Sequence, residues 1–173
     1  MVALAMADQA PRIEHPNRKK AASQITRVLV IVLLLASAFL VLVITLGGWE
    51  ALEGAKALQI AYMVLYVVLA YFVARWSRGV LPVIAALAIV LLIFAAVSAP
   101  AWFDRDHTGF SDPALPSDLL GLISALLVPV QLLLIAVAMS GFRQAWNVEI
   151  EHAPEEPAPR PERRGGGPSP APA

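Results

Sequence analysis

Residues 28–46 read VLVIVLLLASAFLVLVITL, a stretch in which only Ser37 and Thr45 are polar. The hydrocarbon core of a bilayer is ~30 Å thick, and a helix needs ~20 apolar residues to cross it. Hydrocarbon offers no hydrogen-bond partner to the backbone, so the N–H and C=O groups of a spanning segment must bond to each other. A helix achieves this within a single segment. The stretch therefore predicts a transmembrane helix.

Three further stretches of this kind follow, at residues 57–74, 80–99 and 119–139, and none of the four contains a charged residue or a histidine. Of the 173 residues, 58% are hydrophobic and 15% are charged, against about 45–50% and about 25% in soluble domains. We predict an all-α integral membrane protein, a four-transmembrane-helix antiparallel up-down bundle within residues 25–140. The five-residue connection 75–79 predicts that the second and third spans are antiparallel neighbours.

The first stretch has an alternative interpretation as a cleaved signal peptide. Cationic residues precede it, and residues 36–38 (Ala-Ser-Ala) resemble a cleavage site. However, apolar sequence continues to Leu46, and the apolar region of a signal peptide is only ~7–15 residues long. An uncleaved span is the favoured interpretation.

The distribution of positive charge predicts the orientation. With four spans, both tails and the 75–79 connection share one side, and that side holds all of the 13 Lys and Arg residues except Lys56 and Arg105. Lys and Arg concentrate on the cytoplasmic side of membrane proteins, so both termini are expected in the cytoplasm. The excess of Arg over Lys, with many Ala and Pro, favours a bacterial plasma membrane. Four tryptophans fall where an interfacial aromatic belt is expected: Trp49, Trp76, Trp102 and Trp146.

The segments outside the spans have distinct compositions. We assign residues 1–24 to a cytoplasmic N-tail and residues 153–173, rich in Pro, to a disordered C-tail. Residues 141–152 form an expected interfacial segment. Apolar residues recur there every four positions, at Phe142, Trp146 and Ile150, which favours a short interfacial helix. The alternation through Val148 leaves a strand as the alternative.

The composition excludes several classes of function. Formal net charge is zero, so no basic surface for nucleic acid is expected. The absence of cysteine excludes disulfides and iron–sulfur clusters. All three histidines lie outside the spans, which opposes haem ligation within the membrane, and proton-coupled carriers usually keep a carboxylate there. We predict no catalytic residue, no cofactor and no bound metal.

A polar layer is predicted near the middle of the membrane. At a rise of ~1.5 Å per residue, Ser37, Tyr66 and Gln131 lie roughly 13–18 Å below the outer boundary. These residues either bond the helices to one another, which we favour, or line a small polar cavity for a substrate. Two further sets share a helix face with members of this layer: Gln59 and Tyr62 with Tyr66, and Ser124 with Gln131.

The loop between the third and fourth spans holds the other candidate site. Asp104, Asp106, His107 and Asp112 offer oxygen and imidazole donors that could hold a divalent cation on the external face. Because loops are normally polar, a solvated loop without metal is the favoured interpretation.

Three functions follow from these features. The leading hypothesis is a non-catalytic protein that serves as an accessory subunit or interaction partner of a larger membrane complex. Its partners would be the lipid bilayer and either another membrane protein or further copies of itself. One alternative is a small oligomeric transporter or pore that uses the midplane layer. The other is an extracytoplasmic-loop site, as in a sensor or a metal-dependent enzyme.

Overall fold

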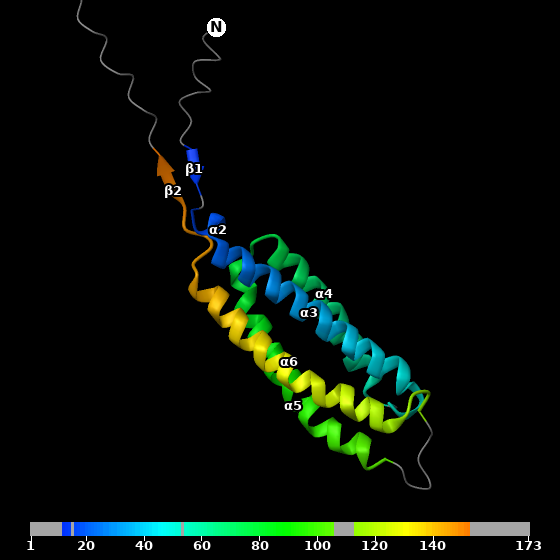
Figure 1. Ribbon diagram of the computed structural model, residues 1–173. Coiled ribbons are helices and arrows are strands. Elements are labelled where there is room, and N and C mark those ends of the chain that lie inside the picture. The colour runs from blue at the N-terminus through cyan, green and yellow to red at the C-terminus, as the bar shows by residue number, and fades with distance from the viewer. Residues whose placement is uncertain (1–11, 15, 53, 106–112, 153–173) are drawn as a thin grey trace, which may run out of the picture. The chain divides into compact units, whose positions relative to one another are not determined.

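The computed structural model describes residues 12–14, 16–52, 54–105 and 113–152. Four of its helices are long and apolar enough to cross a membrane. Successive helices run antiparallel (Figure 1), which confirms the predicted four-helix membrane bundle. The helices are α2 (Pro16–Lys19), α3 (Ala21–Gly47), α4 (Lys56–Ala74), α5 (Leu81–Phe103) and α6 (Ser117–Arg143), with 3-10 turns η1 (Trp49–Ala51) and η2 (Arg78–Val80).

Most of the long helices extend beyond the apolar stretches that predict them. Helix α3 begins seven residues before its apolar stretch, because Ser23 and Thr26 are buried against the rest of the bundle and the Thr26 hydroxyl donates to the Ala22 carbonyl. Helix α5 continues through Pro100, and the Asp104 N–H donates to the Pro100 carbonyl at 3.0 Å. Helices α3, α5 and α6, with 27, 23 and 27 residues, are therefore longer than the ~20 residues that the hydrocarbon requires.

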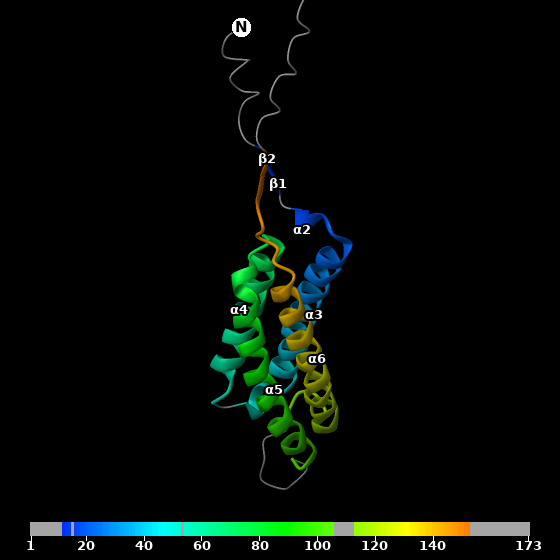
Figure 2. The ribbon, with the colours of Figure 1, turned by 90° about the vertical axis from the view of Figure 1, so that its left-hand side faces the viewer.

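Among the four long helices, three pairs are in close contact. Helix α3 contacts α4 and α6, and α5 packs most extensively along α6 (Figures 1 and 2). Small residues allow backbones to approach closely in membranes, and α5 buries four alanines in this bundle: Ala85, Ala88, Ala95 and Ala99. Helices α4 and α5 are antiparallel, as expected, but they contact each other much less than these three pairs do, although only a short turn joins them. The bundle is therefore open along the α4–α5 edge.

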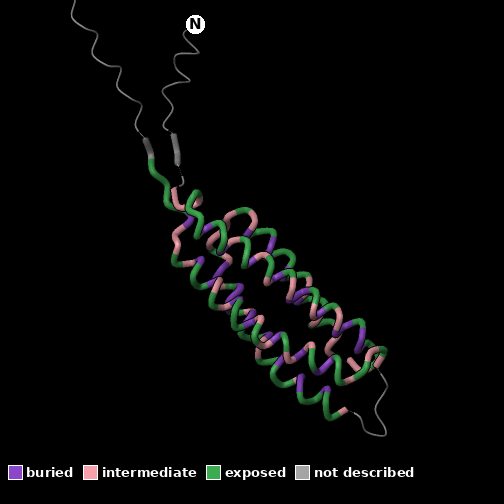
Figure 3. Tube along the Cα trace, in the orientation of Figure 1, coloured by how far each residue is buried: buried purple, intermediate pink, exposed green. Residues whose placement is uncertain are grey.

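The burial pattern is that of a membrane bundle. Buried positions lie on the faces that the helices turn toward one another, and the outward faces are exposed (Figure 3). The exposed faces carry large apolar side chains such as Phe39, Val97 and Leu122, which suits contact with lipid. The buried core includes Val30, Leu34, Leu69, Val73, Ile84, Leu127 and Leu134.

The short strands β1 (Arg12–Glu14) and β2 (Ile150–His152) belong to a separate compact unit, distinct from the helical unit His15–Val148. They pair antiparallel, with Arg12 opposite His152 and Glu14 opposite Ile150. The predicted interfacial helix is wrong beyond Arg143, because α6 ends there and Ala145 has a φ of 49°. The strand alternative fits only the last residue of the alternating stretch, Ile150, where β2 begins. The tail segments 1–11 and 153–173, predicted as disordered at the C-terminus, lie outside the described residues.

The tryptophans differ from the predicted interfacial belt. Trp49 is 41% exposed, but Trp102 is buried and Trp146 is completely buried. The Trp146 ring packs edge-on against Trp76, with ring centroids 5.4 Å apart. The chain turns back after α6, so Trp146 covers the end of the helical core instead of facing lipid.

Candidate functional site

The residues of the predicted polar layer meet at the centre of the bundle. Ser37 lies on α3, Tyr66 on α4 and Gln131 on α6, and each side chain is at most 1% exposed. The Tyr66 hydroxyl donates to Gln131 Oε1 at 2.9 Å, and Gln131 Nε2 donates to Ser37 Oγ at 2.8 Å. The Ser37 hydroxyl in turn donates to the Leu33 carbonyl at 2.7 Å. One chain of hydrogen bonds therefore links three helices.

This layer is closed, in the sense that its polar groups bond to one another or to the backbone. Each hydroxyl hydrogen in it has an acceptor, and the Gln131 amide uses both of its ends. The Tyr62 ring contacts the Tyr66 ring edge-on at 5.8 Å and covers it on one side. An inter-helix hydrogen bond in a membrane contributes about 0.6 kcal/mol on average, so the layer orients the helices and adds modest stability.

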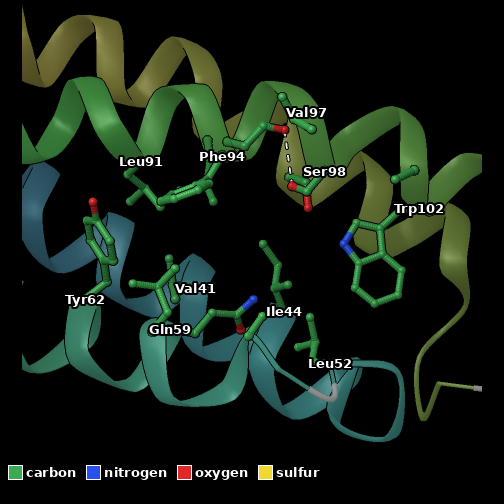
Figure 4. A pocket seen from close by; sticks show the side chains of 16 residues that line it. Val41, Ile44, Leu52, Gln59, Tyr62, Leu91, Phe94, Val97, Ser98 and Trp102 are labelled. Carbon is green, nitrogen blue, oxygen red and sulfur yellow. Dashed lines mark hydrogen bonds between the residues drawn. The ribbon is translucent and has the colours of Figure 1, made fainter.

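A cavity of about 340 Å³ lies beside this layer, on the side of the α3–α4 and α5–α6 connections. We call it the α4–α5 cavity because it occupies the open edge between those helices. Figure 4 shows Gln59, Tyr62, Leu91, Phe94 and Trp102 around it. Residues from α3 and α6 complete its wall: Val41, Ile44, Ser124 and Leu127.

The polar groups that line the α4–α5 cavity are few. The Thr45 hydroxyl donates to the Val41 carbonyl and contacts the Gln59 amide, so one end of that amide is occupied and the other faces the cavity (Figure 4). The indole nitrogen of Trp102 also points into the cavity (Figure 4). The Ser98 hydroxyl is occupied, because it donates to the Ala95 carbonyl at 3.3 Å.

Ser124 differs from the other hydroxyl residues of the spans. It is 1% exposed, lines the cavity, and its Oγ has no hydrogen-bond partner among the described residues. Leaving a buried hydroxyl unpaired costs about 1–3 kcal/mol. The Ser124 hydroxyl therefore carries a cost that a hydrogen-bond acceptor in contact with it would remove.

The polar faces predicted from the sequence are thus divided between two places. Tyr66 and Gln131 enter the closed layer, and the residues that share their helix faces, Gln59 and Ser124, line the cavity. Helical spacing placed each pair on one face, but it could not show that the bundle opens at the level of Gln59 and Ser124. Nothing in the sequence indicated that Trp102 would line a cavity, because its position predicted only a place at the membrane interface.

Of the predicted loop cluster, only Asp104 lies within the described residues. Asp104 follows the last residue of α5, and Asp106, His107 and Asp112 lie outside the described residues. Within the described ranges, no group of three or more His, Asp or Glu residues is placed to hold a metal ion. The metal-site hypothesis therefore remains a prediction.

Arginines at the opposite end of the bundle contact helix ends in a way that the sequence did not indicate. Arg27 on α3 donates to the Ala74 carbonyl at the end of α4, and its guanidinium lies 4.5 Å from the Trp76 ring. Arg78 donates to the Phe142 carbonyl near the end of α6 at 2.7 Å. Because the last carbonyls of a helix lack partners within the helix and carry partial negative charge, both contacts stabilise helix ends.

Comparison with protein-family models, with curated proteins and with solved structures finds no match to this chain. A functional interpretation therefore depends on the polar layer, the α4–α5 cavity and the surface of the bundle.

Proposed function

We propose that this multi-pass membrane protein is non-catalytic and acts as an accessory subunit or interaction partner of a larger membrane complex. The observation that carries this proposal is the closed hydrogen-bonded layer of Ser37, Tyr66 and Gln131. Catalysis needs a reactive group held in reach of a substrate. These buried groups are instead hydrogen-bonded to one another. The part of the bundle that a partner protein can bind is its apolar outer surface.

The proposal includes a location. Both termini face the cytoplasm of a bacterial cell and the helices cross the plasma membrane, because Lys and Arg gather on the side of the termini and of the α4–α5 turn. The partner is another membrane protein or a second copy of this chain, bound to the lipid-facing surface.

The experiment is photo-crosslinking in the native membrane. A photoreactive amino acid is placed at exposed positions of three helices, in turn at Phe39, Ile93 and Leu122, and the protein is purified in mild detergent. We expect a stoichiometric protein adduct from one face and none from the others. A monodisperse monomer that crosslinks only to lipid from all three positions would contradict the proposal.

A second candidate, a small transporter, is favoured by one observation only, the α4–α5 cavity of about 340 Å³. Transport through the midplane would need the polar layer to open, so Gln131→Leu and Tyr66→Phe should abolish flux into proteoliposomes. Flux that survives both substitutions would remove a mechanism based on this layer.

A further inference from the structure

We propose that the α4–α5 cavity binds one glycerophospholipid from the bilayer leaflet next to the α3–α4 and α5–α6 connections. An acyl chain would enter between α4 and α5, and an ester carbonyl of the lipid would accept hydrogen bonds from Ser124 and Trp102. This proposal is independent of a protein partner, because it concerns a cavity within a single chain.

The place and size of the cavity fit an acyl chain. Three apolar residues that line it are 45–68% exposed on the outer surface of the bundle, so its opening faces the hydrocarbon: Leu58, Phe94 and Val97. A volume of about 340 Å³ is near the lower end of the range for ligand pockets, about 300–1,000 Å³. The space therefore suits one segment of an acyl chain, with the rest of the lipid outside the cavity.

The polar groups of the cavity require a neutral ligand that accepts hydrogen bonds. No charged residue lines it within the described part of the chain, so an ionised group inside would have no counter-charge. An indole N–H can only donate, and the unpartnered Ser124 hydroxyl can donate as well. An ester carbonyl meets both conditions.

Cations at the same end of the bundle suit the phosphate of such a lipid. Lys56 begins α4 next to Ala55 of the cavity wall, and its ammonium lies 4.7 Å from the Trp49 ring. Arg105 lies 5.3 Å from the Trp102 ring and donates to the Ala51 carbonyl at 3.3 Å. These are the two cations that the sequence places on this side of the membrane, and both lie close to the cavity.

The test uses the full chain in nanodiscs of phosphatidylcholine that contain a trace of the same lipid with a photoactivatable group on one acyl chain. After illumination, the labelled residues are identified by mass spectrometry. We expect labelling to concentrate on cavity residues such as Leu91 and Leu127. Labelling spread evenly over the outward faces of all four helices would overturn the proposal.

Two pairs of variants separate binding in the cavity from general contact with lipid. Ser98→Phe fills the cavity, and Ala96→Phe places the same ring on the exposed face of the same helix. Ser124→Ala removes the unpartnered hydroxyl, and Ser140→Ala removes an exposed hydroxyl from the same helix. Cavity labelling should fall about threefold to tenfold in Ser98→Phe and Ser124→Ala, as expected for losing one favourable contact, and should not change in the two controls. Equal labelling in each pair would overturn the proposal.

The carbonyl is tested with an ether-linked analogue of the same lipid, which lacks ester carbonyls. In the unmodified protein the ether lipid should label the cavity about threefold to tenfold less than the ester lipid, and in Ser124→Ala the difference should shrink. No difference between the two lipids in the unmodified protein would overturn the role of the carbonyl. A protein adduct from Leu91 or Phe94 in native membranes would show that a partner helix occupies the cavity instead.

Discussion

The ring of Trp76 meets the ring of Trp146 edge to face, with centroids 5.4 Å apart and planes at 83°. Trp76 adopts a φ of 63°, in the left-handed region that favours glycine. Its N–H donates to the Val73 carbonyl, and the N–H of Ser77 donates to the Phe72 carbonyl, so α4 ends in a Schellman motif with tryptophan in the usual glycine position. The contact with Trp146 offsets the backbone strain.

This arrangement predicts an unusual order of stability at position 76. Both Trp76→Ala and Trp76→Gly lose the ring contact, but only glycine removes the strain. We expect Trp76→Gly to be more stable than Trp76→Ala by about 1 kcal/mol, measured by unfolding in mixed micelles. At Ser77, where φ is −76°, the order should be the usual one, with alanine the more stable. The same order at both positions would contradict the explanation.

The polar layer predicts the effect of Gln131→Leu. The substitution leaves the Tyr66 hydroxyl buried without its acceptor, and we expect the free energy of unfolding to fall by about 1–2 kcal/mol. Adding Tyr66→Phe should cost less than the sum of the two single changes, because the two residues share one bond. Tyr71→Phe is the control, because Tyr71 is exposed, and it should change stability little.

Arg27 is expected to contribute to stability beyond its charge. Arg27→Met removes the hydrogen bond to the Ala74 carbonyl and the contact with the Trp76 ring, and should lower the free energy of unfolding by about 1–2 kcal/mol. Lys20→Met removes the same charge from an exposed position near by on the same flank. If both variants unfold alike, the contacts of Arg27 contribute nothing measurable.

Gly48 is required by the close approach of Trp102. A Cβ atom at position 48 would lie 2.6 Å from Trp102 Cη2 and 3.0 Å from the Ile44 carbonyl oxygen, and that backbone atom cannot move aside cheaply. Gly48→Ala should therefore cost about 1–3 kcal/mol in thermal or denaturant unfolding. Gly79→Ala, where a Cβ atom would meet nothing within 4 Å, should be neutral. A neutral Gly48→Ala would show that the Trp102 ring can move away from position 48 at little cost.

The topology is tested with reporter fusions. We expect alkaline phosphatase to be inactive when fused to either terminus and active when inserted at Gly54, where a Cβ atom would also meet nothing within 4 Å. Termini on opposite sides of the membrane would require an odd number of spans and would contradict the four-helix arrangement.

Depth could be predicted for the polar residues, but partners could not. Helical rise placed Ser37, Tyr66 and Gln131 at one level, and the structure joins these three. The same reasoning could not separate Tyr66 from Gln59, which lies on the same face of α4. Tyr66 meets Gln131 of α6, whereas Gln59 lies at the cavity. The loop residues Asp106, His107 and Asp112 lie outside the described ranges, so their predicted role is untested.

The sequence by itself determined that four helices cross a membrane, because apolar stretches of this length can satisfy their backbone in hydrocarbon only as helices. Only the tertiary structure decided that α5 pairs with α6 and separates from α4, that Trp146 is buried, and that Ser124 lines a cavity. The physical reason is that hydropathy reports the surroundings of a helix as a whole. Which face meets which neighbour depends on the shapes of the packed side chains, and a single helix does not contain that information.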